Sequence, residues 1–457
     1  MKKRSIFAAT LFFSALILGA CGAEGEEGQA TDSNGSEGDK TPIEITWRGT
    51  GESDNIRRYL EGFETDFESD NPDIDIVLAP IMASEGDYFS KVALTMQSPD
   101  TAPDIVSEDT FMLSSDANAG YLASLDEHVE SWEGWDMFIE NIKTGTTGED
   151  GSIYGIPTTT DSRGIWYNKQ VFADAGLPED WQPNSWEDVY AAGEAIKNSG
   201  SDAVPFSMNV AKANGEAVSM QTFEMLLYGT GETLYDSDTQ KWNVNGQGIV
   251  DSLEFVDEIM NQRELGPSLS IALNSSYGSV MTQDLLPNGG VGMVLDGNWN
   301  IGNYLEGGAA PLDNPEEVLG FATFPTQNGE EPGFVTMAGG WSWAIPENAQ
   351  NQEASWRVIE AMSSKESQAD RAVIEGTLTV REDSAEDSRY LERPLIEPAT
   401  KALENAQFRP KNDLYPNVSI EIQNAVEAVA SGSMTPEEAA ASYKEAVTGI
   451  VGEENTY

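Results

Sequence analysis

The chain has 457 residues, of which 25 are basic and 78 acidic, giving a formal net charge of −53. So many carboxylates repel the phosphate backbone of DNA and RNA, which excludes nucleic acid as a partner. The carboxylates are spread along the whole chain instead of being gathered in one tail. This favours an acidic, solvated surface of a salt-adapted (halophilic) source over a site for a cationic ligand, and both interpretations stay open here.

The N-terminus has the features of an export signal. Basic residues at positions 2–4 precede an apolar run over 6–18, which is too short for a permanent membrane span. The run ends just before Cys21, the only cysteine of the chain, after small residues that resemble a bacterial lipobox. We expect residues 1–20 to be removed and Cys21 to carry lipid chains such as palmitate at the outer face of the cell membrane. An ordinary cleaved signal with an incidental cysteine is the alternative.

The segment that follows is polar. Residues 22–41 are mostly Gly, Glu, Ser, Asp, Asn and Gln, without a cluster of apolar residues. Such a composition buries too little surface to offset the entropy of ordering. Residues 21–41 are therefore predicted to form a flexible, lipid-anchored linker.

The next elements alternate between strand and helix. Apolar and polar residues alternate over 43–47, apolar residues recur at helical spacing over 56–67, and a second alternating run covers 74–78. Two strands around one helix predict a β-α-β unit with parallel pairing. Further on, Ser185 and Thr435 each precede an apolar helical pattern and have an acidic residue three positions later, which predicts capped helix starts. The predicted class is α/β, with open sheets covered by helices.

A series of short segments resembles one known family, the extracellular solute-binding proteins of carbohydrate ABC importers, of the maltose-binding type. Each segment is weak by itself, but they follow the family's order from about residue 43 to 450. They are Ile45-Thr46-Trp47, Asn71-Pro72-Asp73-Ile74, Ala102-Pro103-Asp104-Ile105-Val106, Ala119-Gly120-Tyr121-Leu122, Tyr154-Gly155-Ile156-Pro157, Trp166-Tyr167-Asn168-Lys169, Gly292-Met293-Val294-Leu295-Asp296-Gly297-Asn298-Trp299 and Gly339-Gly340-Trp341-Ser342-Trp343.

The resemblance implies a two-lobed, type II periplasmic-binding-protein fold in which the chain crosses three times between lobes that close on a ligand. We expect the crossings near 156–160, 324–326 and 345–347. The N-terminal lobe would then comprise 42–156 and 325–345, and the C-terminal lobe 157–324 and 346–457.

A sugar ring has apolar C–H faces and hydroxyl groups around its edge. A receptor for it therefore needs flat aromatic side chains together with charged or amide groups. By resemblance, Trp299 stacks on the sugar and Asp296 bonds hydroxyls beside it. Trp341 and Trp343 point to the same side of a strand, and we expect one of them, preferably Trp341, to line the cleft. Each also has a structural interpretation, as a core residue or a helix cap.

Further candidates lie at strand ends and crossings. Trp47 and Glu52 follow the first strand, at the edge where open α/β sheets bind ligands. The remaining candidates are the Glu108 and Asp109 pair after the strand at 103–106, Asp161 and Arg163 beyond the first crossing, and Tyr415, a late aromatic contact in the relatives. The loop after Trp47 and the Glu108–Asp109 pair depart from the maltose pattern, which puts maltose itself in doubt.

No catalytic residue, metal or cofactor is expected. The chain has one histidine, His128, and lacks the Walker, Gly-x-Ser-x-Gly and His-Glu-x-x-His motifs, although an oxygen-ligated Ca²⁺ stays open. The expected partners are a carbohydrate, the transmembrane subunits of an ABC permease and the membrane, for a protein that is itself a monomer. Two alternatives remain: a binding protein for a polyamine or peptide, and a secreted glycoside hydrolase, which needs only two carboxylates.

Overall fold

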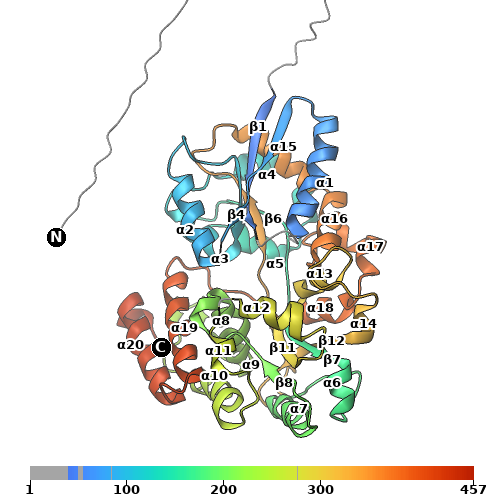
Figure 1. Cartoon of the computed structure of the whole chain (residues 1–457). Helices are drawn as coiled ribbons and strands as arrows, with labels where there is room; N and C mark the ends of the chain where they lie inside the picture. The colour runs from blue at the N-terminus through green and yellow to red at the C-terminus, as the bar shows by residue number, and fades with distance from the viewer. Residues whose placement is uncertain (1–39, 50–54, 84, 275) are drawn as a thin grey trace, which may run out of the picture. The chain divides into compact units, whose positions relative to one another are not determined.

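The structure is a computed structural model that describes residues 40–49, 55–83, 85–274 and 276–457. Cys21, the predicted signal peptide and almost all of the predicted linker lie outside the described residues, as does Glu52. Residues 40–457 form one compact unit that contains two large β-sheets, each covered by helices (Figure 1).

The first sheet has five strands in the order β3-β1-β5-β14-β6. β1 pairs in parallel with β3 and β5, whereas β14 runs antiparallel between β5 and β6. α1 (Asn55–Asp70) separates β1 from β3 in the chain, so the predicted β-α-β unit is confirmed. The strands of this sheet are β1 (Thr41–Thr46), β3 (Ile74–Leu78), β5 (Ile105–Asp109), β6 (Ile156–Pro157) and β14 (Trp341–Ala344).

The second sheet has six strands in the order β15-β13-β12-β7-β11-β8. β7 lies between β12 and β11 and is antiparallel to both, while β11 and β8 are parallel. Its strands are β7 (Arg163–Asn168), β8 (Val204–Ser207), β11 (Val291–Gly297), β12 (Leu319–Pro325), β13 (Phe334–Met337) and β15 (Ala406–Gln407). Two small ladders add β2 (Arg48–Gly49) with β4 (Ile81–Met82) and β9 (Tyr235–Asp236) with β10 (Lys241–Trp242).

Helices bury their apolar faces on both sheets, so each lobe has its own core. The first lobe is built with α1, α2 (Glu85–Met96), α3 (Thr110–Asn118), α4 (Asp126–Glu130), α5 (Glu140–Lys143), α15 (Gln352–Met362), α16 (Lys365–Glu375) and α17 (Ser388–Leu391). The second lobe is built with α6 (Lys169–Asp174), α7 (Trp186–Asn198), α8 (Glu216–Val218), α9 (Met225–Gly229), α10 (Gln247–Asp257), α11 (Leu269–Ala272), α12 (Tyr277–Ser279), α13 (Ile301–Tyr304), α14 (Pro315–Val318), α18 (Ile396–Ala402), α19 (Tyr415–Ala430) and α20 (Pro436–Val451).

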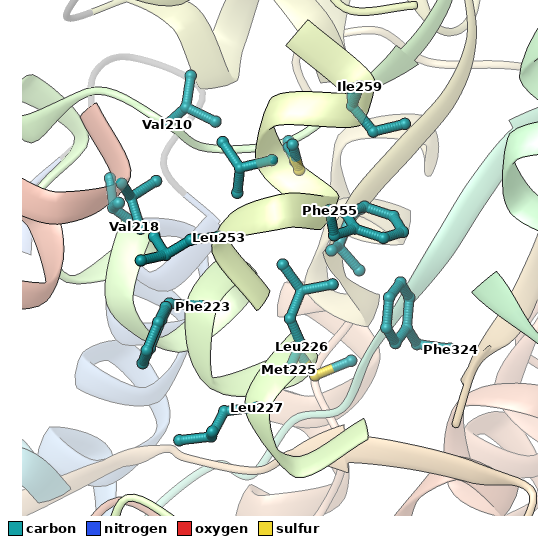
Figure 2. Close-up of a cluster of buried hydrophobic side chains, with 14 of the residues drawn as sticks. Val210, Val218, Phe223, Met225, Leu226, Leu227, Leu253, Phe255, Ile259 and Phe324 are labelled. Atoms are coloured by element: carbon teal, nitrogen blue, oxygen red, sulfur yellow. The ribbon is translucent and has the colours of Figure 1, made fainter. Parts of the chain in front are cut away.

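The largest apolar cluster fills one side of the second sheet. Figure 2 shows Phe255 and Leu253 of α10 beside Leu226 of α9 and Phe324 of β12. Phe255 and Phe324 have ring centroids 6.2 Å apart at a steep angle, an edge-to-face arrangement typical of packed aromatic cores. This packing holds the strands that lead towards the first lobe.

The two predicted helix starts are confirmed. Ser185 accepts a hydrogen bond from the backbone N–H of Asp188 and begins α7. Thr435 and Glu438 form a reciprocal capping box at the start of α20, with Pro436 as the first helical residue. These contacts satisfy backbone donors that have no partner within the helix.

The chain passes between the two sheets three times, as expected for the type II fold. The first passage is the segment 158–162 between β6 and β7, and the second is 338–340 between β13 and β14. The second passage was predicted near 324–326, but β12 and β13 pair in one sheet through Phe324 and Val335. Pro325 therefore ends a strand of a hairpin within the second lobe.

The third passage also differs from the prediction near 345–347. Ile345 belongs to the core of the first lobe. α15 packs there through Trp356, Ile359 and Met362, and α16 through Ile374. Leu378, between α16 and α17, already packs in a cluster with Trp166 and Phe321 of the second sheet, and the chain enters the second lobe at 392–395, between α17 and α18. The apolar faces of α15 and α16 explain the difference, because they are buried in the core of the first lobe and keep these two helices in the N-terminal lobe.

Candidate functional site

The second passage brings the two sheets close together at Gly339 and Gly340. A Cβ atom on Gly339 would lie 3.0 Å from Arg409 Nη2 and 3.6 Å from Arg163 Nη1, so two guanidinium groups approach this glycine. Gly340 has φ of +147°, and a Cβ atom there would lie 2.0 Å from the carbonyl oxygen of Thr159. Only glycine fits so close to the first passage.

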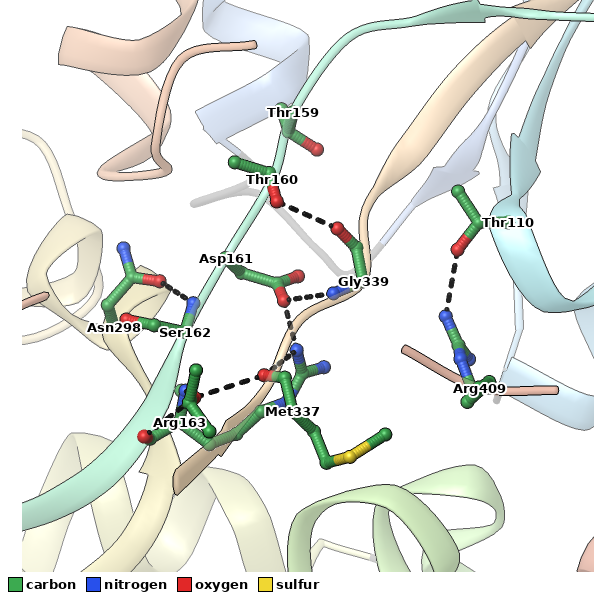
Figure 3. A network of polar contacts seen from close by, with 12 residues as sticks. Thr110, Thr159, Thr160, Asp161, Ser162, Arg163, Asn298, Met337, Gly339 and Arg409 are labelled. Carbon is green, nitrogen blue, oxygen red and sulfur yellow. Dashed lines mark hydrogen bonds and ion pairs between the residues drawn. The ribbon is translucent and has the colours of Figure 1, made fainter. Parts of the chain in front are cut away.

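On one side of Gly339, three of the predicted residues come together. Asp161 accepts hydrogen bonds from Arg163 and, at 2.9 Å, from the backbone N–H of Gly339 (Figure 3). Arg163 Nη1 also donates to the carbonyl of Met337 at 3.2 Å. The guanidinium carbon of Arg163 lies 4.8 Å from the ring centroid of Trp299, a cation–π distance. Trp299 is half-buried.

Asp296 and Trp299 lie at the end of β11. A Cβ atom on Gly297 would lie 1.9 Å from the Trp299 ring, so this glycine lets the indole fold back over the strand end. Asp296 accepts a hydrogen bond from the N–H of Gly297 at 2.7 Å. Burial raises the pKa of Asp296 to about 6, against the opposing effects of its hydrogen bonds and of Arg163. Its charge therefore changes close to neutral pH.

On the other side of Gly339, Arg409 joins the lobes. Its Nη2 atom donates to Asp109 at 2.5 Å, at the end of β5. The same atom donates at 3.1 Å to Thr110, the first residue of α3 (Figure 3). Asp109 also caps α3 by accepting from the N–H of Phe111. Arg409 itself follows β15 of the second sheet, and its Nη1 atom lies 3.6 Å from Glu216. The ion pair thus connects the two lobes.

Behind Arg409 lies a buried group of two carboxyls and a phenol. The hydroxyl of Tyr415 lies 2.5 Å from Glu216 Oε1 and 2.6 Å from Glu224 Oε1. One hydroxyl has a single proton to donate, so one of the carboxyls must itself carry a proton. Burial, together with the charge of Glu216, raises the pKa of Glu224 to about 8. Glu224 is therefore the neutral, donating member at neutral pH.

Trp341 belongs to a row of aromatic rings that reaches Arg409. Its half-buried indole stacks on Phe89 with a centroid distance of 6.0 Å, and Phe89 contacts Phe111 edge-to-face at 5.0 Å. The guanidinium of Arg409 lies 4.7 Å from the Phe111 ring, whose other neighbour is Tyr415 at 6.3 Å. Trp341 therefore lines the same region as the charged residues.

Three predicted residues lie in the interior of the first lobe instead. Trp47 and Trp343 are fully buried in its core, because β1 and β14 are covered by α1, α15 and α16. Trp343 packs in the core of the first lobe, whereas Trp341 is half-buried against a different apolar cluster. Glu108 is also fully buried, and burial beside Asp116 and Asp109 raises its pKa well above the ordinary value. A carboxyl that is fully buried inside the lobe does not fit the predicted binding role.

Tyr415 differs from its prediction as well. It is fully buried, and its hydroxyl is engaged by Glu216 and Glu224, so it supports Arg409 instead of offering an aromatic face. The sequence did not indicate Arg409, Glu216, Glu224 or Met220, whose Cε atom lies 3.0 Å from the position of a Gly339 Cβ. Met220 and Glu224 lie on a π-helical turn, Ser219–Glu224, a distortion that often marks functional sites but has no clear sequence signal.

The described part of the chain has neither a cluster of metal ligands nor a helix that could span a membrane. Within residues 40–49, 55–83, 85–274 and 276–457, no three His, Cys, Asp or Glu side chains are grouped as metal ligands. In the same ranges, every helix is too short or too polar to cross a membrane.

Comparison with known proteins identifies the class. The model of the bacterial extracellular solute-binding protein family matches residues 52–369, and the chain belongs to this family. A maltooligosaccharide ABC transporter solute-binding lipoprotein of Streptococcus pneumoniae (strain ATCC BAA-255 / R6) is 22% identical over 372 residues, which is 80% of this chain and 78% of that protein. An arabinooligosaccharide-binding protein of Bacillus subtilis (strain 168) is 22% identical over 313 residues, 67% of this chain and 65% of its own.

Solved structures confirm the fold. An ABC transporter solute-binding protein from Thermotoga lettingae TMO, bound with α-D-tagatose, superimposes with a TM-score of 0.77 at 23% identity, covering 90% of this chain and all (100%) of that one. The architecture is that of a type II periplasmic binding protein.

Proposed function

We propose that this solute-binding protein captures a carbohydrate between its two lobes and delivers it to the membrane subunits of an ABC importer. The observation that carries the proposal is the convergence of indole rings, guanidinium groups and carboxylates around Gly339, where two passages meet. Such a set matches the apolar faces and hydroxyl rim of a sugar. Two relatives named for oligosaccharides, and a structural neighbour bound with α-D-tagatose, support this ligand class.

In this proposal the residues divide the recognition between them. Trp299 and Trp341 offer ring faces to the sugar, while Asp296, Asp161 and Arg163 exchange hydrogen bonds with its hydroxyls. Asp109 contributes from the first sheet. The Nε atoms of Arg163 and Arg409 and the Oε2 atom of Glu224 are buried without a hydrogen-bond partner among the described residues. A polyhydroxylated ligand supplies acceptors and a donor to such atoms, which are costly to leave unpaired.

Contacts that join the passages would make binding and closure one event. The ion pair between Arg409 and Asp109 links the sheets directly, and Thr160 donates to the carbonyl of Gly339 at 3.1 Å between the first and second passages (Figure 3). A ligand that touches both lobes stabilises the arrangement in which these contacts exist, by its differential affinity for that state.

The proposal includes an extracytoplasmic location and no catalysis. We propose that acylated Cys21 anchors a monomer to the outer face of the membrane, in keeping with the lipoprotein among the relatives. Replacement Cys21→Ser is expected to release the protein into the culture medium, as measured by fractionation and immunoblotting. Continued membrane retention of the variant would contradict the anchor.

Thermal unfolding of the purified protein in the presence of a panel of ligands tests the binding function. The panel contains mono- and oligosaccharides, polyols, polyamines and short peptides. A ligand at one hundred times its Kd adds about 2.7 kcal/mol to the free energy of unfolding, which is measurable as a higher Tm. We expect stabilisation by a carbohydrate, confirmed by isothermal titration. Stabilisation by polyamines or peptides, without any stabilisation by sugars, would overturn the proposal. Release of a hydrolysis product from a glycoside would indicate an enzyme.

A further inference from the structure

Five arginines of the described chain are at least nine-tenths buried: Arg163, Arg371, Arg381, Arg393 and Arg409. Four of these five form ion pairs with a carboxylate at bonding distance. Arg393 forms none with any described residue, although the chain has 78 acidic side chains. A buried guanidinium without a counter-charge costs several kcal/mol, so this exception calls for a compensating group.

The contacts that Arg393 does make are electrically neutral. One Nη atom donates to the carbonyl of Ala372 in α16, and the guanidinium lies 4.5 Å from the ring centroid of Tyr390. Its Nε atom is buried without a hydrogen-bond partner in the described structure. Burial lowers the pKa of Arg393 to about 10, which still leaves the side chain charged at neutral pH.

Two carboxylates that are adjacent or hydrogen-bonded to residues of the cavity wall have other partners. Glu375, adjacent to Gly376 in the cavity wall described below, pairs with Arg371 at 2.6 Å. Glu316 accepts a hydrogen bond from the backbone N–H of Leu395 at 3.0 Å. The positive charge of Arg393 is therefore not neutralised by either neighbour.

A small cavity lies beside Arg393 at the third passage. Its free volume is about 10 Å³, which is enough for one water-sized particle. Residues of the second sheet, Trp166 and Phe321, form part of the wall, together with Asn298 and Gly376. Asn298 connects the first passage to this place, because it accepts from the N–H of Ser162 at 2.9 Å and donates to the carbonyl of Gly376 at 3.1 Å.

We infer that this cavity binds one small monatomic anion of the halide class, paired with Arg393, at the joint between the lobes. A monatomic anion fits a site that has a single charged donor and mostly apolar walls, because it needs few directed hydrogen bonds. Its charge offsets the buried guanidinium, as the carboxylates do for the other four arginines. The occupied cavity holds α16, the strand end at Asn298 and the segment 393–395 together.

The test compares the Tm of the purified protein in solutions of different anions at matched ionic strength. Chloride and bromide should raise Tm by a few degrees above gluconate, with a saturable dependence that follows ligand linkage. Sulfate stabilises proteins generally by exclusion from the surface and serves as the second reference. Replacement Arg393→Gln should abolish the difference between chloride and gluconate and leave the sulfate effect intact.

The matched control is Arg389→Gln in the same helix region. Arg389 is exposed and paired with Asp387 and Asp370, so this variant should keep the full chloride response. Crystals of the wild-type chain soaked in bromide should show an anomalous peak within contact distance of Arg393, a readout that does not depend on the variant folding. Equal Tm in chloride and gluconate, or a cavity without bromide, would mean that water alone occupies it and would overturn the inference.

Discussion

The molecule contains two trios of the same chemistry in different surroundings. In the first lobe, Arg371 lies 5.0 Å from the ring centroid of Trp343 and pairs with Glu375 at 2.6 Å. Between the lobes, Arg163 lies 4.8 Å from the Trp299 ring and pairs with Asp161.

The surroundings separate their roles. Trp343 is fully buried and Arg371 is 1% exposed, so water and ligands are excluded from the indole ring and the guanidinium of that trio. Trp299 is half-buried at the end of a strand, beside a passage of the chain. The same residue types therefore stabilise a core in one place and can meet a ligand in the other.

The largest expected effect is on the free energy of unfolding and concerns the buried trio of the first lobe. Trp343→Ala should lower the free energy of unfolding by about 3–5 kcal/mol, because a large buried side chain is removed from a packed interior. Denaturant unfolding measures this loss. Trp299→Ala, the matched control, should cost about 1 kcal/mol because its ring is only half-buried. Equal losses for the two variants would break the comparison.

A second prediction concerns the charged groups between the lobes and the pH dependence of stability. The pKa of Glu224 rises from 4.5 to about 8 on folding, so between these values the folded state holds a proton that the unfolded state has released. The free energy of unfolding therefore falls as pH rises through this window, by up to about 1.4 kcal/mol per pH unit.

Glu224→Gln removes this titration and should flatten the decline, as measured by denaturant unfolding at several pH values. The exposed Glu127→Gln should retain the wild-type slope. An unchanged slope in Glu224→Gln would show that Glu224 is ionised throughout the window and does not donate to Tyr415.

The third prediction concerns ligand binding by the trio between the lobes. Trp299→Ala should weaken carbohydrate binding at least tenfold, about 1.4 kcal/mol, through loss of the stacking face. Isothermal titration with the sugar found in the panel measures the change. The fold should persist, as judged by an unchanged circular dichroism spectrum. An unaltered affinity would show that Trp299 has only a structural role.

The smallest expected effect is the pH dependence of affinity from Asp296. Its pKa of about 6 means that the carboxylate is charged above pH 6 and neutral below it. A charged acceptor forms the stronger hydrogen bond, so affinity should fall severalfold, by less than tenfold, between pH 7 and 5. Asp296→Asn should bind more weakly at pH 7 and show little change over this range. A variant with the full wild-type pH dependence would assign the effect to another group.

Much of the fold was predictable because its signals are local. The alternation at 43–47 and 74–78 reflects strands with one covered face, and Ser185 and Thr435 cap helices through bonds within four residues. The segments around Trp299 and Gly339 identified the family without any knowledge of packing. Asp161, Arg163 and Asp296 were predicted in the same way, because Asp296 lies inside such a segment and Asp161 and Arg163 closely follow another.

The sequence by itself thus determined the α/β class, the family and the strand ends that carry Trp299 and Asp161. Only the tertiary structure decided which tryptophans are core, where the second and third passages lie, and that Arg409 meets Asp109 from 300 residues away. The physical reason is the separation along the chain of the residues that interact. Caps and strand periodicity depend on neighbours in the chain, whereas burial and ion pairing depend on which distant surfaces the helices cover.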